Sequence, residues 1–281
     1  MKSLVSKTMK YKMLVADFGE TLVHTNSDVE PQNIDAICTY QNAGGIFALT
    51  TGREWPSIKR KIFSQSFQNI QDLPVICCYG SIIAYCKTSR VLFSQPINRK
   101  LVIDIINVLE NNQMIYAVVS MDFTITKLTT DLSTLIWKQY GNQIKVQSLE
   151  DIIQFIEVEN LEIFKIDVYH VDDVNLLRGV MGEKYFTQLK YYLNDRGFVE
   201  FVNSKAGKGQ ALHYLANYFS LPLSDVVVLG DALNDLEMFE VAENKVAVSN
   251  GIESLKNMSS LVIDNHDYLG VSRLINHILE G

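Results

Sequence analysis

Short apolar runs alternate with longer amphipathic stretches over the first eighty residues of the chain. The runs at 13–16, 46–49 and 74–79 are too short for helices, so we predict that they are buried strands. The stretches at 31–43 and 56–67 predict helices, and the first has a proline near its start and two glycines after its end. Strands that alternate with helices predict a parallel sheet covered by helices.

The pattern changes after residue 81 and returns after the strand predicted at 197–202. Between these points we predict strands at 115–119, 124–128, 162–169, 186–192 and 197–202, with helices at 100–111, 132–140 and 172–181. Beyond them, alternation resumes, with helices at 209–219, 233–241, 252–258 and 269–279 and strands at 225–229, 245–248 and 261–263. The middle segment, with its strands in pairs and helices between them, predicts a smaller α+β domain.

We therefore predict an α/β fold, with a doubly wound, Rossmann-like parallel-sheet core interrupted by an inserted domain. The core would comprise residues 1–84 and 199–281, and the inserted α+β domain residues 85–198. Core segments on both sides of the insertion would complete one sheet.

The composition of the chain argues against several kinds of binding partner and cellular location. The 281 residues carry a formal net charge of −7 and show no cluster of Lys and Arg, which argues against binding of nucleic-acid backbones. No apolar run reaches the roughly 18 residues that a membrane-spanning helix needs, and residues 1–12 lack the apolar core of a secretory signal. The four cysteines form no CxxC pair, which favours reduced thiols. We expect a cytoplasmic monomer or homodimer.

Polar residues follow three of the predicted core strands at the point where each strand ends. They are Asp17, residues 50–53 and residues 230–235, and Lys208 begins a helix shortly before the last group. Ligands bind outside the carboxyl ends of parallel strands, so these residues should converge. A carboxylate can act as a covalent nucleophile, acidic oxygens suit Mg²⁺, and hydroxyl and backbone N–H groups hold phosphate oxygens. The pattern indicates phosphoryl chemistry.

These residues resemble the four motifs of the haloacid dehalogenase superfamily, and the resemblance extends over essentially the whole chain. Asp-Phe-Gly-Glu-Thr-Leu at 17–22 resembles the first motif, usually DxDGTL, and Thr-Gly-Arg at 51–53 matches the second. Lys208 matches the third, and Gly-Asp-Ala-Leu-Asn-Asp at 230–235 matches the fourth, GDxxND. The insertion between the second and third motifs is similar to the Cof-type branch, in which this domain is an α/β cap of the C2 type.

The resemblance implies a role for each matched residue. Asp17 would be the nucleophile that becomes an aspartyl phosphate, and Lys208 would offset negative charge during catalysis. The phosphate of the substrate would be bound by Thr51, Gly52, Lys208 and Asn234. The cap would close over the bound substrate and exclude water.

The resemblance also implies a Mg²⁺ site formed by Asp17, the backbone carbonyl of Gly19, Asp231 and Asp235. At one position the chain departs from the family. The second aspartate of the first motif, the general acid and base, is Gly19 here, and the glycine after it is Glu20. Gly19 keeps the carbonyl but cannot transfer a proton, a contribution worth roughly 10²- to 10⁴-fold in rate. In extended backbone the Glu20 side chain would point away from that place.

We therefore expect a Mg²⁺-dependent phosphohydrolase of the Cof type that acts on a small phosphorylated metabolite through an aspartyl phosphate. An alternative is a catalytically impaired pseudo-phosphatase that binds Mg²⁺ and a phosphorylated ligand. A phosphotransferase that passes the phosphoryl group to an acceptor also stays open. Tyr79, which precedes Gly80, stands where the Cof-type branch usually has Asn, so we expect altered contacts with the cap or substrate.

Overall fold

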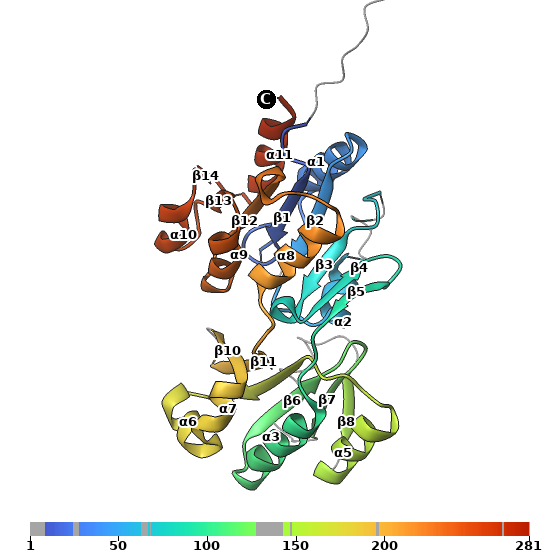
Figure 1. Ribbon diagram of the computed structural model, residues 1–281, viewed down its shortest axis with the longest axis vertical. Helices are drawn as coiled ribbons and strands as arrows, with labels where there is room; N and C mark the ends of the chain where they lie inside the picture. The colour runs from blue at the N-terminus through green and yellow to red at the C-terminus, as the bar shows by residue number, and fades with distance from the viewer. Residues whose placement is uncertain are drawn as a thin grey trace, which may run out of the picture.

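The computed structural model describes residues 9–24, 28–62, 67, 69–127, 143–146, 148–194, 197–265 and 267–280. They form two bodies, each built on its own sheet, and two chain connections join the bodies (Figure 1). The first sheet has eight strands and the second has six. Within the described ranges, no helix is both long and apolar enough to cross a bilayer.

The first body, the core, is a mainly parallel sheet in the order β14-β13-β12-β1-β2-β3-β4-β5. Its strands are β1 (Met13–Asp17), β2 (Ile46–Thr50), β3 (Pro74–Cys77), β4 (Ile82–Tyr85), β5 (Val91–Ser94), β12 (Val226–Gly230), β13 (Asn244–Val248) and β14 (Leu261–Ile263). All neighbours from β14 to β3 are parallel, and β4 and β5 add an antiparallel hairpin. The predicted doubly wound core is confirmed.

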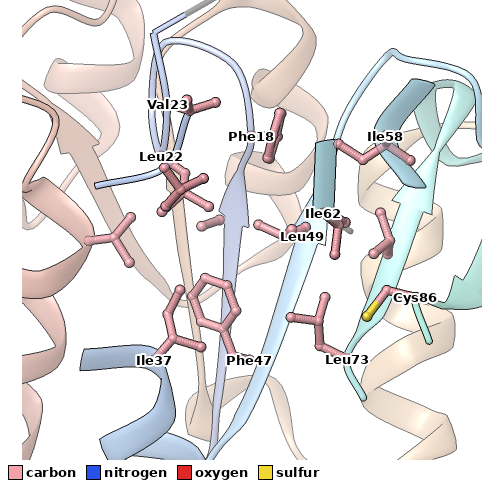
Figure 2. Packing of buried hydrophobic residues seen from close by; sticks show 14 of the residues in the cluster. Phe18, Leu22, Val23, Ile37, Phe47, Leu49, Ile58, Ile62, Leu73 and Cys86 are labelled. Atoms are coloured by element: carbon pink, nitrogen blue, oxygen red, sulfur yellow. The ribbon is translucent and has the colours of Figure 1, made fainter. Parts of the chain in front are cut away.

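Helices cover both faces of this sheet because its central strands are apolar on both sides. Leu14 and Ala16 of β1 belong to one buried cluster, and Met13 and Val15 belong to another. The first cluster includes α1 (Pro31–Asn42), α2 (Trp55–Ile62) and α11 (Gly270–Glu280); the second includes α8 (Lys208–Tyr218), α9 (Leu236–Val241) and α10 (Glu253–Met258). Figure 2 shows the first cluster, where the side chains of β2 meet those of the helices.

The second body, the cap, is a six-stranded sheet in the order β10-β11-β9-β6-β7-β8. Its strands are β6 (Ile115–Val119), β7 (Thr124–Lys127), β8 (Gln143–Val146), β9 (Lys165–Tyr169), β10 (Leu189–Asn194) and β11 (Phe198–Asn203). Its helices are α3 (Arg99–Asn111), α5 (Leu149–Val158), α6 (Val174–Met181) and α7 (Glu183–Gln188). Val118, Ile166 and Phe201 pack among these helices, whereas Val119, on the opposite face, joins the core cluster.

Several elements differ from the prediction. The hairpin β4–β5, β8 and α5 were not predicted, and residues 186–188 belong to α7 rather than to a strand. The helix predicted at 132–140 lies outside the described residues. Because β5 belongs to the core sheet and β11 to the cap sheet, we propose that the division between the bodies lies near residues 94 and 203 rather than 84 and 199.

Candidate active site

Asp17 and Lys208 lie at the centre of a buried ionic group at the carboxyl end of the core sheet. Asp17 is the last residue of β1, and Lys208 is the first residue of α8. Lys208 Nζ donates to Asp17 Oδ1 at 2.6 Å, to Asp235 Oδ1 at 2.6 Å and to Asn234 Oδ1 at 3.2 Å. One lysine thus links two other segments of the sequence, one at Asp17 and one at residues 234–235, to the start of its own helix.

The strand order explains why these segments meet. From β1 the chain proceeds through β2 and β3 on one side, and β12, β13 and β14 extend the sheet on the other. The boundary between β1 and β12 is therefore the topological switch point, where doubly wound sheets bind ligands. Asp17 ends β1 and Asp231 directly follows β12, so both carboxylates lie at this boundary.

Asp231 and Asp235 are held by a short turn and by the first motif. Asp235 Oδ2 accepts hydrogen bonds from the backbone N–H groups of Asp231 and Ala232, at 2.9 Å and 3.1 Å. Thr21 Oγ1, which is buried, donates to Asp231 Oδ1 at 2.7 Å. Carboxylate oxygens of Asp17, Asp231 and Asp235 all lie within 4.8 Å of one another.

The phosphate loop predicted at 51–53 lies beside this group. Asp17 pairs with Thr50 in the register of β1 and β2, so Thr51 follows at the same edge of the sheet. Thr51 Oγ1 accepts a hydrogen bond from the backbone N–H of Arg53 at 3.1 Å, which closes a tight turn around Gly52. The turn leaves Gly52 without space for a side chain, because a Cβ atom there would come within 2.4 Å of the Tyr79 ring.

Burial and crowding of like charges shift the pKa values of the site. Burial raises the pKa of Asp17 to about 7, in spite of the opposing attraction of Lys208. Burial, reinforced by repulsion from Asp17 and Asp235, raises the pKa of Asp231 to about 8. Burial alone would lower the pKa of Lys208, but Asp17 and Asp235 hold it above its usual range. When all three carboxyl groups are ionised, they carry more negative charge than one lysine offsets.

Gly19 and Glu20 occupy the place where the chain departs from the first motif. A Cβ atom on Gly19 would meet no heavy atom within 4 Å, so an open space lies where a side chain would begin. Glu20 has a φ of 59° and is not extended, contrary to our expectation. Its side chain nevertheless has another partner, since Glu20 Oε2 accepts a hydrogen bond from the Tyr268 hydroxyl at 2.8 Å.

Two residues support the site without having been singled out in the sequence. Thr21 belongs to the first motif, and its hydrogen bond to Asp231 could have been anticipated from the family pattern. Asn265 is buried and donates to the carbonyls of Glu20 and Thr21, at 3.3 Å and 3.1 Å. Asn265 follows β14, far from the first motif in the sequence, and no pattern identifies it.

Comparison with known proteins places this chain in a family. The family model described as haloacid dehalogenase-like hydrolase matches residues 14–275. The 5-amino-6-(5-phospho-D-ribitylamino)uracil phosphatase of Bacillus subtilis is 26% identical over 96% of this chain and 99% of its own length. The pyridoxal phosphate phosphatase of Escherichia coli is 22% identical over 96% of this chain and 100% of its own length.

Solved structures share the fold over nearly the full length. A haloacid dehalogenase-like hydrolase from Bacillus subtilis has a TM-score of 0.79 at 24% identity and covers 95% of this chain and 99% of its own. Another from Bacteroides thetaiotaomicron has a TM-score of 0.81 at 19% identity, with 96% and 100% covered. With the family model matching nearly all of its length, the chain belongs to the haloacid dehalogenase-like hydrolases.

Proposed function

We propose that the chain is a Mg²⁺-dependent phosphatase that hydrolyses small phosphomonoesters with Asp17 as its nucleophile. The observation that carries the proposal is the contact of Lys208 with both Asp17 and Asp235, at 2.6 Å each, beside the carboxylate of Asp231. A lysine in this position offsets the charge of the nucleophile and of an incoming phosphoryl group.

The residues present fit a divalent cation. Three carboxylates from two strand ends have oxygens within 4.8 Å of one another, and hard cations such as Mg²⁺ prefer such oxygens. Asp17, Asp231 and Asp235 would hold the ion, together with the carbonyl of Gly19. When bound, Mg²⁺ supplies positive charge to the phosphoryl oxygens. Burial, and after it repulsion between neighbouring carboxylates, raises the pKa values of Asp17 and Asp231, and a bound cation would relieve both effects.

The reaction would proceed in two displacements at phosphorus. An Asp17 oxygen forms a bond to phosphorus while the bond from phosphorus to the leaving oxygen breaks. Water then attacks the phosphorus of the aspartyl phosphate and releases inorganic phosphate and the Asp17 carboxylate. Thr51 and the backbone of the turn around Gly52 would hold the phosphoryl oxygens, with Lys208 and Asn234. Since Gly19 cannot transfer protons, the leaving oxygen and the attacking water exchange protons with solvent, and we expect slow turnover.

The nature of the substrate is supported by the relatives. Two proteins that match over nearly their whole length are phosphatases for a ribitylaminouracil phosphate and for pyridoxal phosphate. Both substrates are small phosphorylated metabolites, and we propose a substrate of this class. The pseudo-phosphatase alternative, which rests on Gly19 alone, has no support among these relatives.

The experiment compares the native protein with Asp17→Asn, using p-nitrophenyl phosphate, Mg²⁺ and stoichiometric enzyme. The good leaving group needs little acid assistance, so we expect a burst of nitrophenol followed by slow turnover. Asp17→Asn should show no burst, and Asp122→Asn, which changes an exposed aspartate of the cap, should behave as the native protein does. Equal bursts from the native protein and Asp17→Asn would contradict the proposed mechanism.

A further inference from the structure

The face of the cap sheet that meets the core carries a buried group of charged residues. Lys165 and Asp167 lie two positions apart on β9, with Lys165 Nζ 3.3 Å from Asp167 Oδ1. Lys165 also donates to Glu200 of β11, and the hydroxyl of Tyr79, from the core, donates to the other Glu200 oxygen. This group therefore spans the junction between the cap and the core.

Glu54 enters the junction from the core side. It directly follows the phosphate loop, at the start of α2, and only 2% of its surface is exposed. Lys165 and Asp167 of the cap are among the charges that act on its carboxyl group. Its Oε1 atom nevertheless has no hydrogen-bond partner among the described residues.

On the cap side, Thr124 supplies a second buried oxygen atom that has no hydrogen-bond partner among the described residues. In the register of the cap sheet, Thr124 lies opposite Val119, and Val119 lies opposite Lys165. Residues directly opposite one another share a face of a sheet, so Thr124 and Lys165 point to the same side, two strands apart. Thr124 is fully buried, and its Oγ1 has no hydrogen-bond partner within the described part of the chain.

Buried polar atoms are nearly always hydrogen-bonded, and an unpaired one costs free energy in the folded protein. Here a carboxyl oxygen from the core, directly after the phosphate loop, and a hydroxyl on the core-facing side of the cap sheet both lack hydrogen-bond partners among the described residues. Sites that bind a substrate by hydrogen bonds leave such groups unpaired until the substrate arrives. Because both atoms are covered when the two bodies meet, a substrate would enter only after the cap moves away from the core.

We propose that Glu54 and Thr124 form a subsite for the leaving group, which binds the hydroxyl groups of a sugar or polyol monophosphate. The inference rests on the proposed phosphatase function and specifies its substrate class. Lys165 lies among these groups and would repel a cationic leaving group, whereas neutral hydroxyls can both donate and accept. Burial raises the pKa of Glu54 to about 7, so the carboxyl group can also do both near neutral pH.

The test compares three phosphomonoesters: ribitol 5-phosphate, n-butyl phosphate and p-nitrophenyl phosphate. The variants are Glu54→Met, which removes the carboxyl group at similar volume, Glu54→Gln, which keeps one acceptor oxygen, and Thr124→Val, which removes only the hydroxyl. The measurement is kcat/KM, which reports the steps up to departure of the leaving group and is independent of how slowly the phosphoryl-enzyme is hydrolysed.

We expect Glu54→Met to lower the ratio of kcat/KM for ribitol 5-phosphate to that for n-butyl phosphate by at least about tenfold. Glu54→Gln and Thr124→Val should lower the same ratio by less. The control is Glu243→Gln, a change at an exposed residue of the core, which should leave the ratio unchanged. Glu54→Met and Thr124→Val should also raise the Tm of the ligand-free protein, since each removes an unpaired buried group.

The other outcomes would overturn the inference in distinguishable ways. Equal loss with ribitol 5-phosphate and n-butyl phosphate would mean that Glu54 acts on the leaving oxygen or on the phosphate loop, not on hydroxyl groups. An unchanged ratio in all variants, with Asp17-dependent turnover intact, would reject the subsite alone. Absence of Asp17-dependent turnover of all three esters would reject the proposed function and, with it, this inference.

Discussion

The hydroxyl of Tyr268 donates a hydrogen bond to Glu20 Oε2 at 2.8 Å and so fixes the acidic side chain that follows Gly19. The backbone of Glu20 is fixed as well, because Asn250 and Asn265 donate to its carbonyl oxygen, at 2.8 Å and 3.3 Å. Glu20 is therefore tied to the C-terminal part of the core on both its side chain and its main chain. We therefore predict that it does not replace the acid that the first motif lacks.

We predict that Glu20→Gln changes turnover of p-nitrophenyl phosphate by no more than about twofold, whereas loss of a general acid or base would cost about 10²-fold or more. The glutamine can still accept the hydrogen bond from Tyr268, so the loop should keep its shape. Steady-state release of inorganic phosphate measures the effect. Tyr268→Phe serves as a comparison, since it releases the Glu20 side chain; a large rise in its turnover would show that Glu20 can act once it is free.

Gly19→Asp should restore proton transfer and raise steady-state turnover by roughly 10²- to 10⁴-fold. The space around Gly19 makes the change feasible, because a Cβ atom there meets no heavy atom within 4 Å. The matched control is Gly179→Asp, the same substitution at an exposed glycine of the cap with equal space. Rapid-quench measurements should show that the gain lies mainly in hydrolysis of the phosphoryl-enzyme. An unchanged rate would mean that another group already performs this step.

Much of the core could be predicted because its strands are short apolar runs bounded by polar residues and glycines. The runs that became β1, β2 and β12 are buried on both faces, so their sequence pattern is unambiguous. The hairpin β4–β5 was missed because it contains exposed and half-buried residues and adds antiparallel strands to a parallel sheet. Helix α5 begins with the capping box of Ser148 and Asp151, a local signal that was present in the sequence and overlooked.

The candidate site likewise contains residues that the sequence predicts and residues that it does not. The predicted residues Asp17, Lys208 and Asp235 contact one another, because motifs at strand ends are brought together by the sheet itself. Their chemical roles remain predictions. Glu54 and Thr124 could not be identified, since a lone acid after a loop or a threonine in a strand has no distinctive pattern. Only the meeting of the two bodies reveals that Glu54 Oε1 and Thr124 Oγ1 are buried without hydrogen-bond partners in the part of the chain that the structure describes.

Lys208→Met should destabilise the metal-free protein by about 3–5 kcal/mol, the usual cost of removing one member of a buried ion pair. The change leaves the carboxylates of Asp17, Asp231 and Asp235 close together without their lysine. Addition of Mg²⁺ should therefore raise the Tm of Lys208→Met more than it raises that of the native protein. Thermal denaturation with EDTA and with Mg²⁺ makes the comparison, and equal Mg²⁺ shifts would contradict this account of the charges.

Asp231→Asn should abolish most of the stabilisation that Mg²⁺ gives to the native protein. A ligand that binds only the folded state stabilises it by about 2.7 kcal/mol at a hundred times its Kd, so a measurable rise in Tm is expected for the native protein. Removing one of three carboxylates weakens the binding of a hard cation. Asp122→Asn, at an exposed position of the cap, should retain the native shift. A shift that survives Asp231→Asn would place the cation elsewhere.

Tyr79 and Tyr192 couple the cap to the phosphate loop. Their rings stack at a centroid distance of 3.9 Å and an angle of 12°, and the Tyr79 ring also covers Gly52. Tyr192 Oη donates to Glu237 of α9 at 3.0 Å, so the pair is anchored in both bodies. A double-mutant cycle of Tyr79→Leu and Tyr192→Leu should give a coupling energy of about 0.5–1.5 kcal/mol, the value typical of an aromatic pair.

The control cycle combines Tyr79→Leu with Tyr218→Leu. Tyr218 lies at the far end of α8, about 15 Å along the helix from the residues that approach Tyr79, so the two effects should add to within about 0.5 kcal/mol. Urea denaturation measures each free energy of unfolding. If the first cycle also proves additive, the stack does not hold the cap against the core, and the tyrosine at position 79 acts within the core alone.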